Sequence, residues 1–430
     1  MKTAPEEFDE EYYLKTHADI AVAIQEGVFT NAKEHYEKFG RQEGRACCFP
    51  EVDKRVAGGG IYTENYFLYP YKGVKKHEEI IFSAPSLDSE GDRPIVERII
   101  TAYHAAVKDQ PEDFRYDKEG MWSFIRLYCR PLLNAIDAKD VEETGRLLSR
   151  MFLDYTTWGL GLSASTAYIA EKAPSQFSDL IQDRILRLGE AIGYYQARNP
   201  EQGVYNAELD VDTSAVVNEV MRKAGIEIPE RPDIGGFYGV RVGKSIIHIR
   251  DISHMMLALQ LQKYNTSNII EIGGGYGGLV FWMHTFGFKD ILSLDLPHMN
   301  VIQAYFLLKS KIDANIVLYG EENTAKEAIR ISPYWAIDTI QDKSYNACVN
   351  QDSLPEMSPA IAAEYMKQIQ RTTKEIFYSV NQESAAANHM ADKQNIVQHL
   401  ARDQKGLKQI QRSLFWVRPG YVEEVYAIIQ

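Results

Sequence analysis

The stretch Asn268–Gly287, NIIEIGGGYGGLVFWMHTFG, places five glycines within six residues directly after a short apolar run. The β-branched run NIIEI predicts a strand, and a helix is expected from about Leu279. Between them, Gly273, Gly275 and Gly278 form the pattern G-x-G-x-x-G. Glycine permits a tight turn and lets a ligand approach the main chain, and the following helix presents free N–H groups. The stretch therefore predicts a ligand-binding loop between a strand and a helix.

An acidic residue follows this loop at a spacing that suits ribose binding. The next predicted strand, DILSLD, ends at Asp295, 22 residues after Gly273. A carboxylate at this point can accept hydrogen bonds from both hydroxyls of an adenosine ribose. The order of strand, glycine loop, helix, strand and acid favours a Rossmann-like α/β domain that binds a nucleoside cofactor.

Two cofactors suit this arrangement, a nicotinamide dinucleotide and S-adenosylmethionine. Glu271 lies on the strand just before the glycines, where a carboxylate would repel a pyrophosphate but attract a sulfonium or an amino group. The chain ends in RSLFWVRPGYVEEVYAII, in which two strand-like runs flank Pro419 and Gly420 and predict an antiparallel hairpin. A methyltransferase sheet closes with such a hairpin, whereas a dehydrogenase usually continues with further parallel units. Both features favour S-adenosylmethionine.

Four segments in this order, IIEIGGGYGGL, LDLPHMNVIQAYFL, NQDSLPEM and FYSVNQES, resemble the sugar O-methyltransferases of bacterial glycan gene clusters, a branch of the class I methyltransferases. The resemblance covers about residues 250–426. It implies an S-adenosylmethionine-dependent O-methyltransferase that acts on a sugar hydroxyl in glycan or nucleotide-sugar metabolism. The cofactor residues that it implies are Glu271, Gly273, Gly275 and Gly277 along the methionine and ribose, Asp295 at the ribose, Glu321 at the adenine, and Asn350 beside the transferred methyl group.

Catalytic residues of such a sheet should lie at the carboxyl ends of its strands. Asp352 and Glu356 follow the predicted fourth strand, and His389 follows the fifth. The helix DISHMMLALQLQKY should run antiparallel to the first strand, and its length of about 20 Å returns Arg250 and His254 to the same edge. A sugar hydroxyl is a poor nucleophile and gains from a general base. We therefore predict Asp352, His254, His389 and Glu356 as catalytic candidates, with Asp352 the first choice as base.

The sequence also allows a metal-binding role for some of these residues and two alternative functions for the protein. Asp352, Glu356 and Glu383 could hold Mg²⁺, which prefers oxygen ligands, but the sequence has no tight acidic cluster and we predict no metal site. A nicotinamide-dependent sugar oxidoreductase or epimerase is one alternative function, although no Tyr-x-x-x-Lys pair is evident after the fourth strand. A non-catalytic binding protein that retains the fold is the other alternative.

Composition narrows the range of partners. The 430 residues carry a net charge of −13, which disfavours an electrostatic grip on nucleic acid. No apolar run approaches the roughly 20 residues of a membrane span. The four cysteines show neither metal-binding nor disulfide spacing, and they predict a reduced, cytoplasmic protein. The expected partner is a sugar or glycan acceptor.

The chain divides into four predicted parts: a small helical module (1–48), an irregular linker (49–93), a helical domain (94–245) and the S-adenosylmethionine-binding methyltransferase domain (246–430). The first part resembles a short module found beside bacterial surface-glycan enzymes, which implies association with a second subunit or with glycan-synthesis machinery. In the helical domain, a capping-box pattern at Asp140 and Glu143 predicts one helix start, and Pro174 predicts another. A third helix is expected to begin at Asp212 or Thr213 and to end at Gly225.

Overall fold

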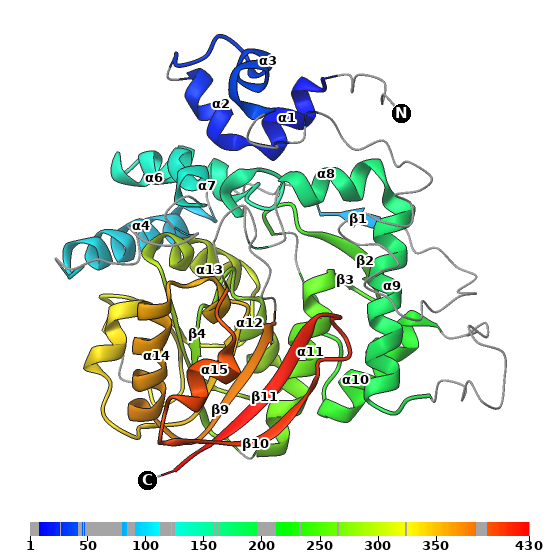
Figure 1. The fold of residues 1–430 in the computed structure, drawn as a ribbon, viewed down its shortest axis with the longest axis vertical. Coiled ribbons are helices and arrows are strands. Elements are labelled where there is room, and N and C mark those ends of the chain that lie inside the picture. Colours follow the sequence, from blue (N-terminus) through cyan, green and yellow to red (C-terminus); the bar gives the residue numbers. More distant parts are fainter. Residues whose placement is uncertain are drawn as a thin grey trace.

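An eight-stranded sheet lies at the centre of the C-terminal half of the protein in the computed structural model (Figure 1). The structure describes residues 8–25, 27–41, 45, 47, 80–83, 91–111, 122, 125–157, 160, 164–195, 212–231, 234–264, 266–322, 325–383 and 394–429. The strands of the sheet are β4 (Asn268–Ile272), β5 (Asp290–Asp295), β6 (Ile316–Leu318), β7 (Ile329–Pro333), β8 (Tyr345–Gln351), β9 (Thr373–Gln382), β10 (Leu407–Leu414) and β11 (Tyr421–Ile428). Their order across the sheet is β10-β11-β9-β8-β4-β5-β7-β6.

The strands in the middle of this sheet pair in parallel. Strands that follow β4 in the chain lie on both sides of it, so the strand order reverses at β4. β4 pairs in parallel with β5 on one side and with β8 on the other, and Ile270 lies opposite both Leu292 and Cys348. Helices cover both faces of such a sheet, so its strands are continuously apolar instead of alternating. The runs NIIEI and DILSLD follow this rule, because every residue between their first and last positions is buried.

The predicted C-terminal hairpin is confirmed. β10 and β11 are antiparallel, and β11 pairs antiparallel with β9, so the hairpin closes one edge of the sheet. Gly420 precedes β11 with a φ of 84°, in the left-handed region that glycine enters at little cost.

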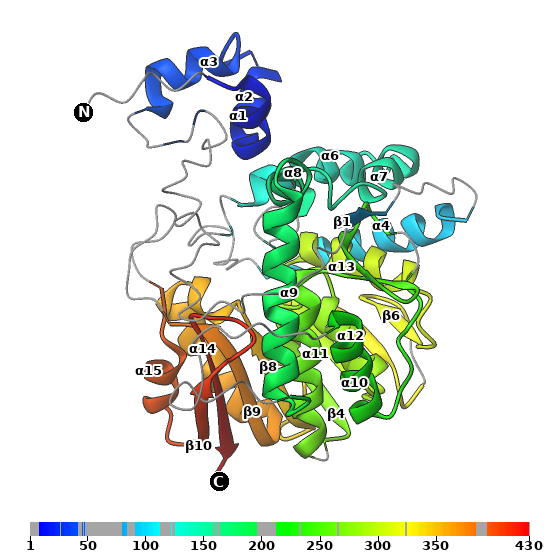
Figure 2. The ribbon, with the colours of Figure 1, turned by 90° about the vertical axis from the view of Figure 1, so that its right-hand side faces the viewer.

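Helices lie on both sides of the sheet, with α14 and α15 on one side and α11 and α12 on the other (Figure 2). The helices of this half are α11 (Ile249–Leu261), α12 (Gly278–Thr285), α13 (Pro297–Lys309), α14 (Pro359–Thr372) and α15 (Val397–Arg402), with short 3₁₀ turns η5 (Gln262–Tyr264), η6 (Tyr334–Thr339) and η7 (Leu354–Glu356). A buried ion pair fixes the start of α11. Arg231 donates to both carboxylate oxygens of Asp251, at 2.8 and 3.0 Å, and its guanidinium lies over the rings of Phe237 and Phe281.

The helical segment before this domain is confirmed as helical. It contains α4 (Arg93–Lys108), η3 (Arg126–Cys129), α6 (Arg130–Asp137), α7 (Val141–Leu148), η4 (Tyr155–Thr157), α8 (Ala164–Lys172), α9 (Pro174–Ala191) and α10 (Thr213–Ala224). Asp140 caps α7 by accepting from the N–H of Glu143 at 3.0 Å, and Pro174 begins α9. Asp212 caps α10, and Gly225 ends it in the left-handed conformation. Its apolar core is continuous with that of the sheet, so the boundary at 245 stays a prediction.

Three short strands form a second, antiparallel sheet that the sequence does not predict. They are β1 (Ile80–Phe82), β2 (Tyr238–Val242) and β3 (Ser245–Ile247). β1 lies inside the predicted irregular linker, and β2 and β3 lie in the glycine-rich connection before α11. Strands of three to five residues depend on their pairing partners, so local sequence carries little signal for them.

The N-terminal helices lie at the end of the molecule farthest from the large sheet (Figure 1). They are α1 (Glu10–Thr16), α2 (Ala18–Gln25), α3 (Ala32–His35) and the π-helical turn η1 (Tyr36–Gly40). A separate small core of Tyr13, Ile20, Ala32 and Cys47 holds them together, and Tyr13 is hydrogen-bonded to His35 at 3.0 Å. Across the described part of the chain, none of the helices is both long enough and apolar enough to span a membrane.

Candidate functional site

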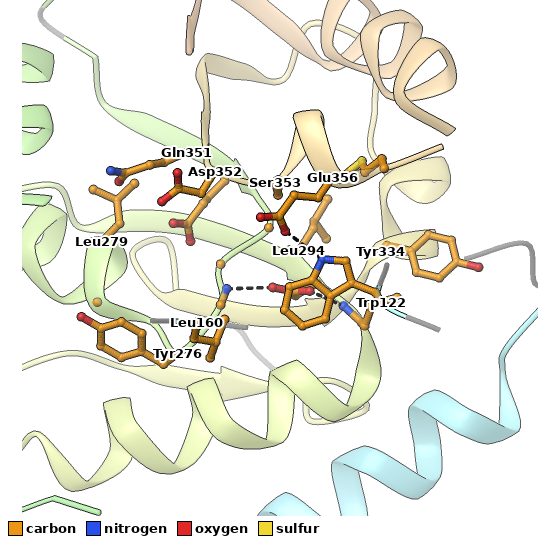
Figure 3. Close-up of a pocket in the computed structure, with 18 of the residues that line it drawn as sticks. Trp122, Leu160, Tyr276, Leu279, Leu294, Tyr334, Gln351, Asp352, Ser353 and Glu356 are labelled. Carbon is orange, nitrogen blue, oxygen red and sulfur yellow. Dashed lines mark hydrogen bonds between the residues drawn. The ribbon is translucent and has the colours of Figure 1, made fainter. Parts of the chain in front are cut away.

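A cavity with an empty volume of about 1120 Å³ opens at the carboxyl ends of β4, β5 and β8 (Figure 3). The glycine loop, the exit of β5 and residues 351–358 form most of its wall. The strand order reverses between β4 and β8, so the loops that leave these two strands turn in opposite directions. A crevice at such a reversal is the usual ligand site of an open α/β sheet.

The backbone of the glycine loop leaves no room for side chains. Gly273 and Gly275 have φ values of 79° and 55°. A Cβ atom on Gly274 would lie 2.1 Å from Ser293 Oγ, and one on Gly273 would lie 2.3 Å from Ser353 Oγ. Gly277 precedes α12 in the left-handed conformation and supplies no side-chain cap, so the first N–H groups of α12 are left uncovered. Gly273 and Gly275 line the cavity as predicted, whereas Gly277 packs behind it against α13.

Two acidic side chains lie beside this loop. Asp295 accepts from the N–H of Gly275 at 2.7 Å, and removal from water raises the pKa of its carboxyl to about 6. Glu271 is 2% exposed and accepts from the Ser293 hydroxyl at 2.6 Å, and burial raises its pKa to about 7. Both line the cavity. A cationic or hydroxyl-bearing ligand would compensate for the water that these carboxyls have lost.

Several buried polar atoms at one end of the cavity have no hydrogen-bond partner among the described residues. They are Nδ1 of His254, the hydroxyl of Tyr276 and both amide atoms of Gln351. A Cβ atom on Gly278, the first residue of α12, would lie 2.4 Å from the Tyr276 hydroxyl and 2.7 Å from Cε1 of His254. Tyr276 and His254 therefore converge on the uncovered start of α12. Buried polar groups without partners are costly, and a ligand that pairs with them removes this cost.

Arg250 and His254 both line the cavity, because α11 returns its first turns to the carboxyl edge of β4. His254 is 8% exposed. Burial lowers the pKa of its imidazole to about 3. The ring is therefore neutral at physiological pH, and it can accept as well as donate a proton.

Asp352 lies in a charge cluster that argues against its predicted role as base. Arg250 donates to Oδ2 of Asp352 at 2.5 Å, and Arg418 donates to the same oxygen. Loss of water alone would raise the pKa of Asp352, but the guanidinium groups of Arg418 and Arg250 outweigh it and lower the pKa to about 2. A carboxylate that binds protons so weakly is a poor general base. Its φ of 68° also holds it in a conformation that is uncommon for aspartate.

Glu356 has the opposite electrostatic environment, although it lies only four residues further along. Loss of water and the negative charge of Asp352 raise the pKa of Glu356 to about 8, and the indole N–H of Trp122 donates to its Oε2 at 3.1 Å. A carboxyl with a pKa near neutrality is suited to accept and release protons at physiological pH. Of the predicted catalytic residues, Glu356 therefore has the environment that suits a base best.

Besides Gly277, two predicted residues do not line the cavity, and a third lies outside the described residues. Asn350 is fully buried behind it, where its amide donates to the carbonyl of Ile272 at 2.9 Å and holds β4 to β8. Glu321 lies on another face, paired with Arg98 of α4 at 2.8 Å, so the structure does not support its predicted place at the adenine. The reason is that β6, which precedes Glu321, is the outermost strand, while β7 takes the expected place beside β5. His389 lies outside the described residues.

Several lining residues were missed from the sequence. Tyr334 directly follows β7, which no strand prediction covered, and it lines the cavity. Trp122 and Leu160 come from the helical segment, and Tyr421 comes from the start of β11. The run AIRISPYW is strand-like, and a strand predicted there would have placed Tyr334 at the end of a strand of the sheet. Nothing near Trp122 or Leu160 marks them as site residues, because only tertiary packing brings them to the sheet.

Two of the three acidic residues considered for Mg²⁺ are held by arginines. Asp352 pairs with Arg250 and Arg418, and Glu383 pairs with Arg412 at 2.7 Å. Within the part of the chain that the structure describes, no three His, Cys, Asp or Glu side chains come together as a metal site.

The large sheet combines a parallel centre, a reversal beside the glycine-loop strand and a closing antiparallel hairpin. This is the fold of the class I methyltransferases. No protein-family model matches the chain, and no curated protein sequence matches it either. The methyltransferase fold is therefore recognised from strand order and not from sequence similarity.

Solved structures with related folds include an S-adenosylmethionine-dependent methyltransferase from Aquifex aeolicus, at 16% identity over 40% of this chain and 88% of that chain, with a TM-score of 0.28. Another is the 1,6-didemethyltoxoflavin-N1-methyltransferase of Burkholderia thailandensis with bound S-adenosylhomocysteine, at 12% identity over 42% of this chain and 78% of that chain, with a TM-score of 0.30. Identities and TM-scores this low carry no information about the reaction or the acceptor.

Proposed function

We propose that this protein is an S-adenosylmethionine-dependent methyltransferase that methylates a hydroxyl group, with a sugar as the first candidate acceptor. The observation that carries the proposal is the distribution of polar groups along the glycine loop. Asp295 lies at the exit of β5, Glu271 lies beneath the loop, and the unpartnered atoms of Tyr276 and His254 lie at the start of α12. These three positions match the ribose, the cationic centre and the carboxylate of the cofactor.

Each match has a chemical reason. A carboxylate beside ribose accepts from its hydroxyls, as Asp295 would do. The carboxylate of the cofactor's methionine suits the partial positive charge at the start of α12, together with the Tyr276 hydroxyl. Glu271 would favour the sulfonium and the amino group, and it would disfavour the pyrophosphate of a dinucleotide. A Cβ atom on Gly274 would lie only 3.0 Å from a carboxylate oxygen of Glu271, so this acid lies directly against the loop.

The cofactor supplies a methyl group that is already activated for displacement. The acceptor oxygen forms the new bond to the methyl carbon while the carbon–sulfur bond breaks, and the electron pair of that bond remains on sulfur. The proton of the acceptor hydroxyl must go to the protein, and Glu356 is the preferred base. His254 also lines the cavity, but a pKa of about 3 makes it a poor base, as for Asp352, so its predicted catalytic role is not retained here.

A sugar acceptor is supported by the aromatic side chains of the cavity and by the resemblance of the four sequence segments. Trp122, Tyr334, Tyr365 and Tyr421 all line the cavity. Flat aromatic faces suit the apolar C–H faces of sugar rings, while carboxyl and amide groups suit their hydroxyls. The acceptor could be a nucleotide sugar, a lipid-linked chain or a polymer, and the module at residues 1–48 is a candidate contact for glycan-synthesis machinery or a second subunit.

Calorimetry with three ligands tests the cofactor. We expect S-adenosylhomocysteine to bind more tightly than 5′-methylthioadenosine, which lacks the amino-acid part, and we expect no binding of NAD. Tyr276→Phe should weaken the binding of S-adenosylhomocysteine by about tenfold to a hundredfold, because a hydrogen bond to its carboxylate is lost, and should leave 5′-methylthioadenosine unaffected. Preferential binding of NAD would support the oxidoreductase alternative, and failure of all three ligands to bind would support a non-catalytic protein.

Product release tests the acceptor. The assay follows S-adenosylhomocysteine formation with a panel of nucleotide sugars and glycans, with and without EDTA. We expect turnover with at least one hydroxyl acceptor and no loss of activity with EDTA. Turnover with amine acceptors alone would reject O-methylation.

A further inference from the structure

We propose that Trp122 is a positioning residue for Glu356, so that the helical segment sets the base of the methyltransferase site. The indole N–H of Trp122 donates to Oε2 of Glu356 at 3.1 Å, across 234 residues of sequence. Both side chains line the cavity, and Figure 3 shows them at the end opposite Tyr276 and Gln351. The proposal rests on the proposed function in one respect, because it takes Glu356 as the base for the acceptor hydroxyl.

The chemistry of indole gives this hydrogen bond a direction. An indole N–H can donate but cannot accept. Oε2 of Glu356 must therefore remain an acceptor toward Trp122 in both protonation states. The exchangeable proton is directed to Oε1, the other oxygen of the carboxyl. Trp122 thereby selects which oxygen of Glu356 takes the acceptor proton, and it restricts rotation of the carboxyl.

The charges around Glu356 show what the indole does to its protonation. Loss of water raises the pKa of Glu356 most, and the negative charge of Asp352 raises it further. The hydrogen bond from Trp122 lowers the pKa, as do the positive charges of Arg250 on α11 and Arg418 before β11. The imidazole of His254, which also lines the cavity, is neutral at physiological pH. Without the indole donor, Glu356 would hold its proton more tightly, and a smaller fraction of it would be ionised and able to act as a base at neutral pH.

Trp122→Phe tests this role, because it keeps an aromatic wall but removes the donor. The infrared carbonyl band of protonated Glu356, assigned by its loss in Glu356→Gln, reports the titration midpoint without any acceptor. We expect the midpoint to rise by about one pH unit in Trp122→Phe, since a hydrogen bond to a charged group is lost. The acid limb of the pH profile of kcat/KM should move upward by the same amount, and affinity for S-adenosylhomocysteine should not change.

The chain offers a matched control. The indole N–H of Trp416 donates to Oε2 of Glu190 at 2.8 Å, which is the same donor and acceptor pair outside the cavity. Trp416→Phe should leave the Glu356 midpoint unchanged. An unchanged midpoint in Trp122→Phe, or an equal shift in both variants, would overturn the proposal, because a merely structural tryptophan would not move this titration selectively.

A second measurement needs no tryptophan variant. In the ¹⁵N-labelled wild-type protein, the indole N–H resonance of Trp122 should shift with the titration of Glu356 and should lose this pH dependence in Glu356→Gln. If the chemical shift of the Trp122 indole did not follow the titration of Glu356, the positioning role would be rejected. Failure of cofactor binding would instead reject the proposed function while leaving this titration intact, so the two failures are distinguishable.

Discussion

The two ends of the cavity are built in different ways. The end that we propose for the cofactor comes mainly from one stretch of chain, in which β4, the glycine loop, α12 and β5 follow one another within residues 268–295. The other end brings together Trp122 of the helical segment, Tyr334 after β7 and Glu356 after β8 (Figure 3). A cofactor that is the same in many enzymes can be bound by one local unit. An acceptor site can vary without disturbing that unit when distant segments supply its side chains.

Two carboxyl groups four residues apart in this cavity also differ, in this case in their proton affinity. Asp352 has two arginine partners and a pKa lowered to about 2, whereas Glu356 has one indole partner and a pKa raised to about 8. Residue type and distance along the chain are therefore poor guides to which acid acts as the base. The neighbours in space decide the proton affinity of each.

The largest expected effect is on turnover in Glu356→Gln. The variant keeps the shape and the contact with Trp122 but removes the basic oxygen, so kcat should fall about 10²-fold to 10⁴-fold with little change in affinity for S-adenosylhomocysteine. Steady-state kinetics and calorimetry measure the two quantities. Full activity in this variant would remove Glu356 as the base.

The next effect concerns the cofactor end. Asp295→Ala removes the acceptor expected for the ribose hydroxyls, and it also frees the N–H of Gly275. Affinity for S-adenosylhomocysteine should fall about 10²-fold or more, because charge-assisted hydrogen bonds are lost. Asp290→Ala is the matched control, since Asp290 begins the same strand and pairs with Arg330 away from the cavity. Equal calorimetric affinity in both variants would remove Asp295 from the cofactor site.

Asp352→Asn should affect stability more than chemistry. It leaves Arg250 and Arg418 close together without their shared carboxylate, so the free energy of unfolding should fall by about 2 kcal/mol. Urea unfolding measures this change, and a variant with Arg250→Gln added should lose less than the sum of the two single effects. If turnover fell as far in Asp352→Asn as in Glu356→Gln, the sequence-based choice of Asp352 as base would return.

The raised pKa values predict how stability depends on pH. The folded protein holds protons on Glu356, Glu271 and Asp295 that the unfolded chain releases near its ordinary carboxyl pKa values. Their contribution is therefore fully present below about pH 4 and is lost as pH rises toward the folded values of about 6 to 8. In Glu356→Gln, the fall in unfolding free energy between pH 5 and 8 should be shallower by up to about 1.4 kcal/mol per pH unit. Parallel slopes in the two proteins would contradict the raised pKa of Glu356.

The smallest expected effect comes from the far end of the molecule. Deletion of residues 1–48 should leave affinity for S-adenosylhomocysteine unchanged, because these helices have their own core and none of their described residues lines the cavity. Calorimetry on the truncated protein tests this expectation. Insolubility or loss of cofactor binding would show that the module belongs to the catalytic unit.

Much of the cofactor end could be predicted because its signals are local. The glycines are required by the positive φ values of Gly273 and Gly275, and the strands on either side are short apolar runs that both faces of a parallel sheet bury. The prediction failed at β7. This strand enters the sheet between β5 and β6, although β6 precedes it in the chain, and it thereby moves Glu321 away from the cavity. Strand insertion of this kind depends on pairing energy across the sheet and leaves no mark in local sequence.

The sequence by itself determined the Rossmann-like centre, the glycine loop with Glu271 and Asp295, and the closing hairpin, because each depends on residues that are close along the chain. Only the tertiary structure decided which carboxyl can act as a base. Asp352 obtains its arginines from positions 102 residues before it and 66 residues after it, and Glu356 obtains its indole from 234 residues away. A proton affinity is set by the charges, donors and water within a few ångströms, and folding alone brings these groups together.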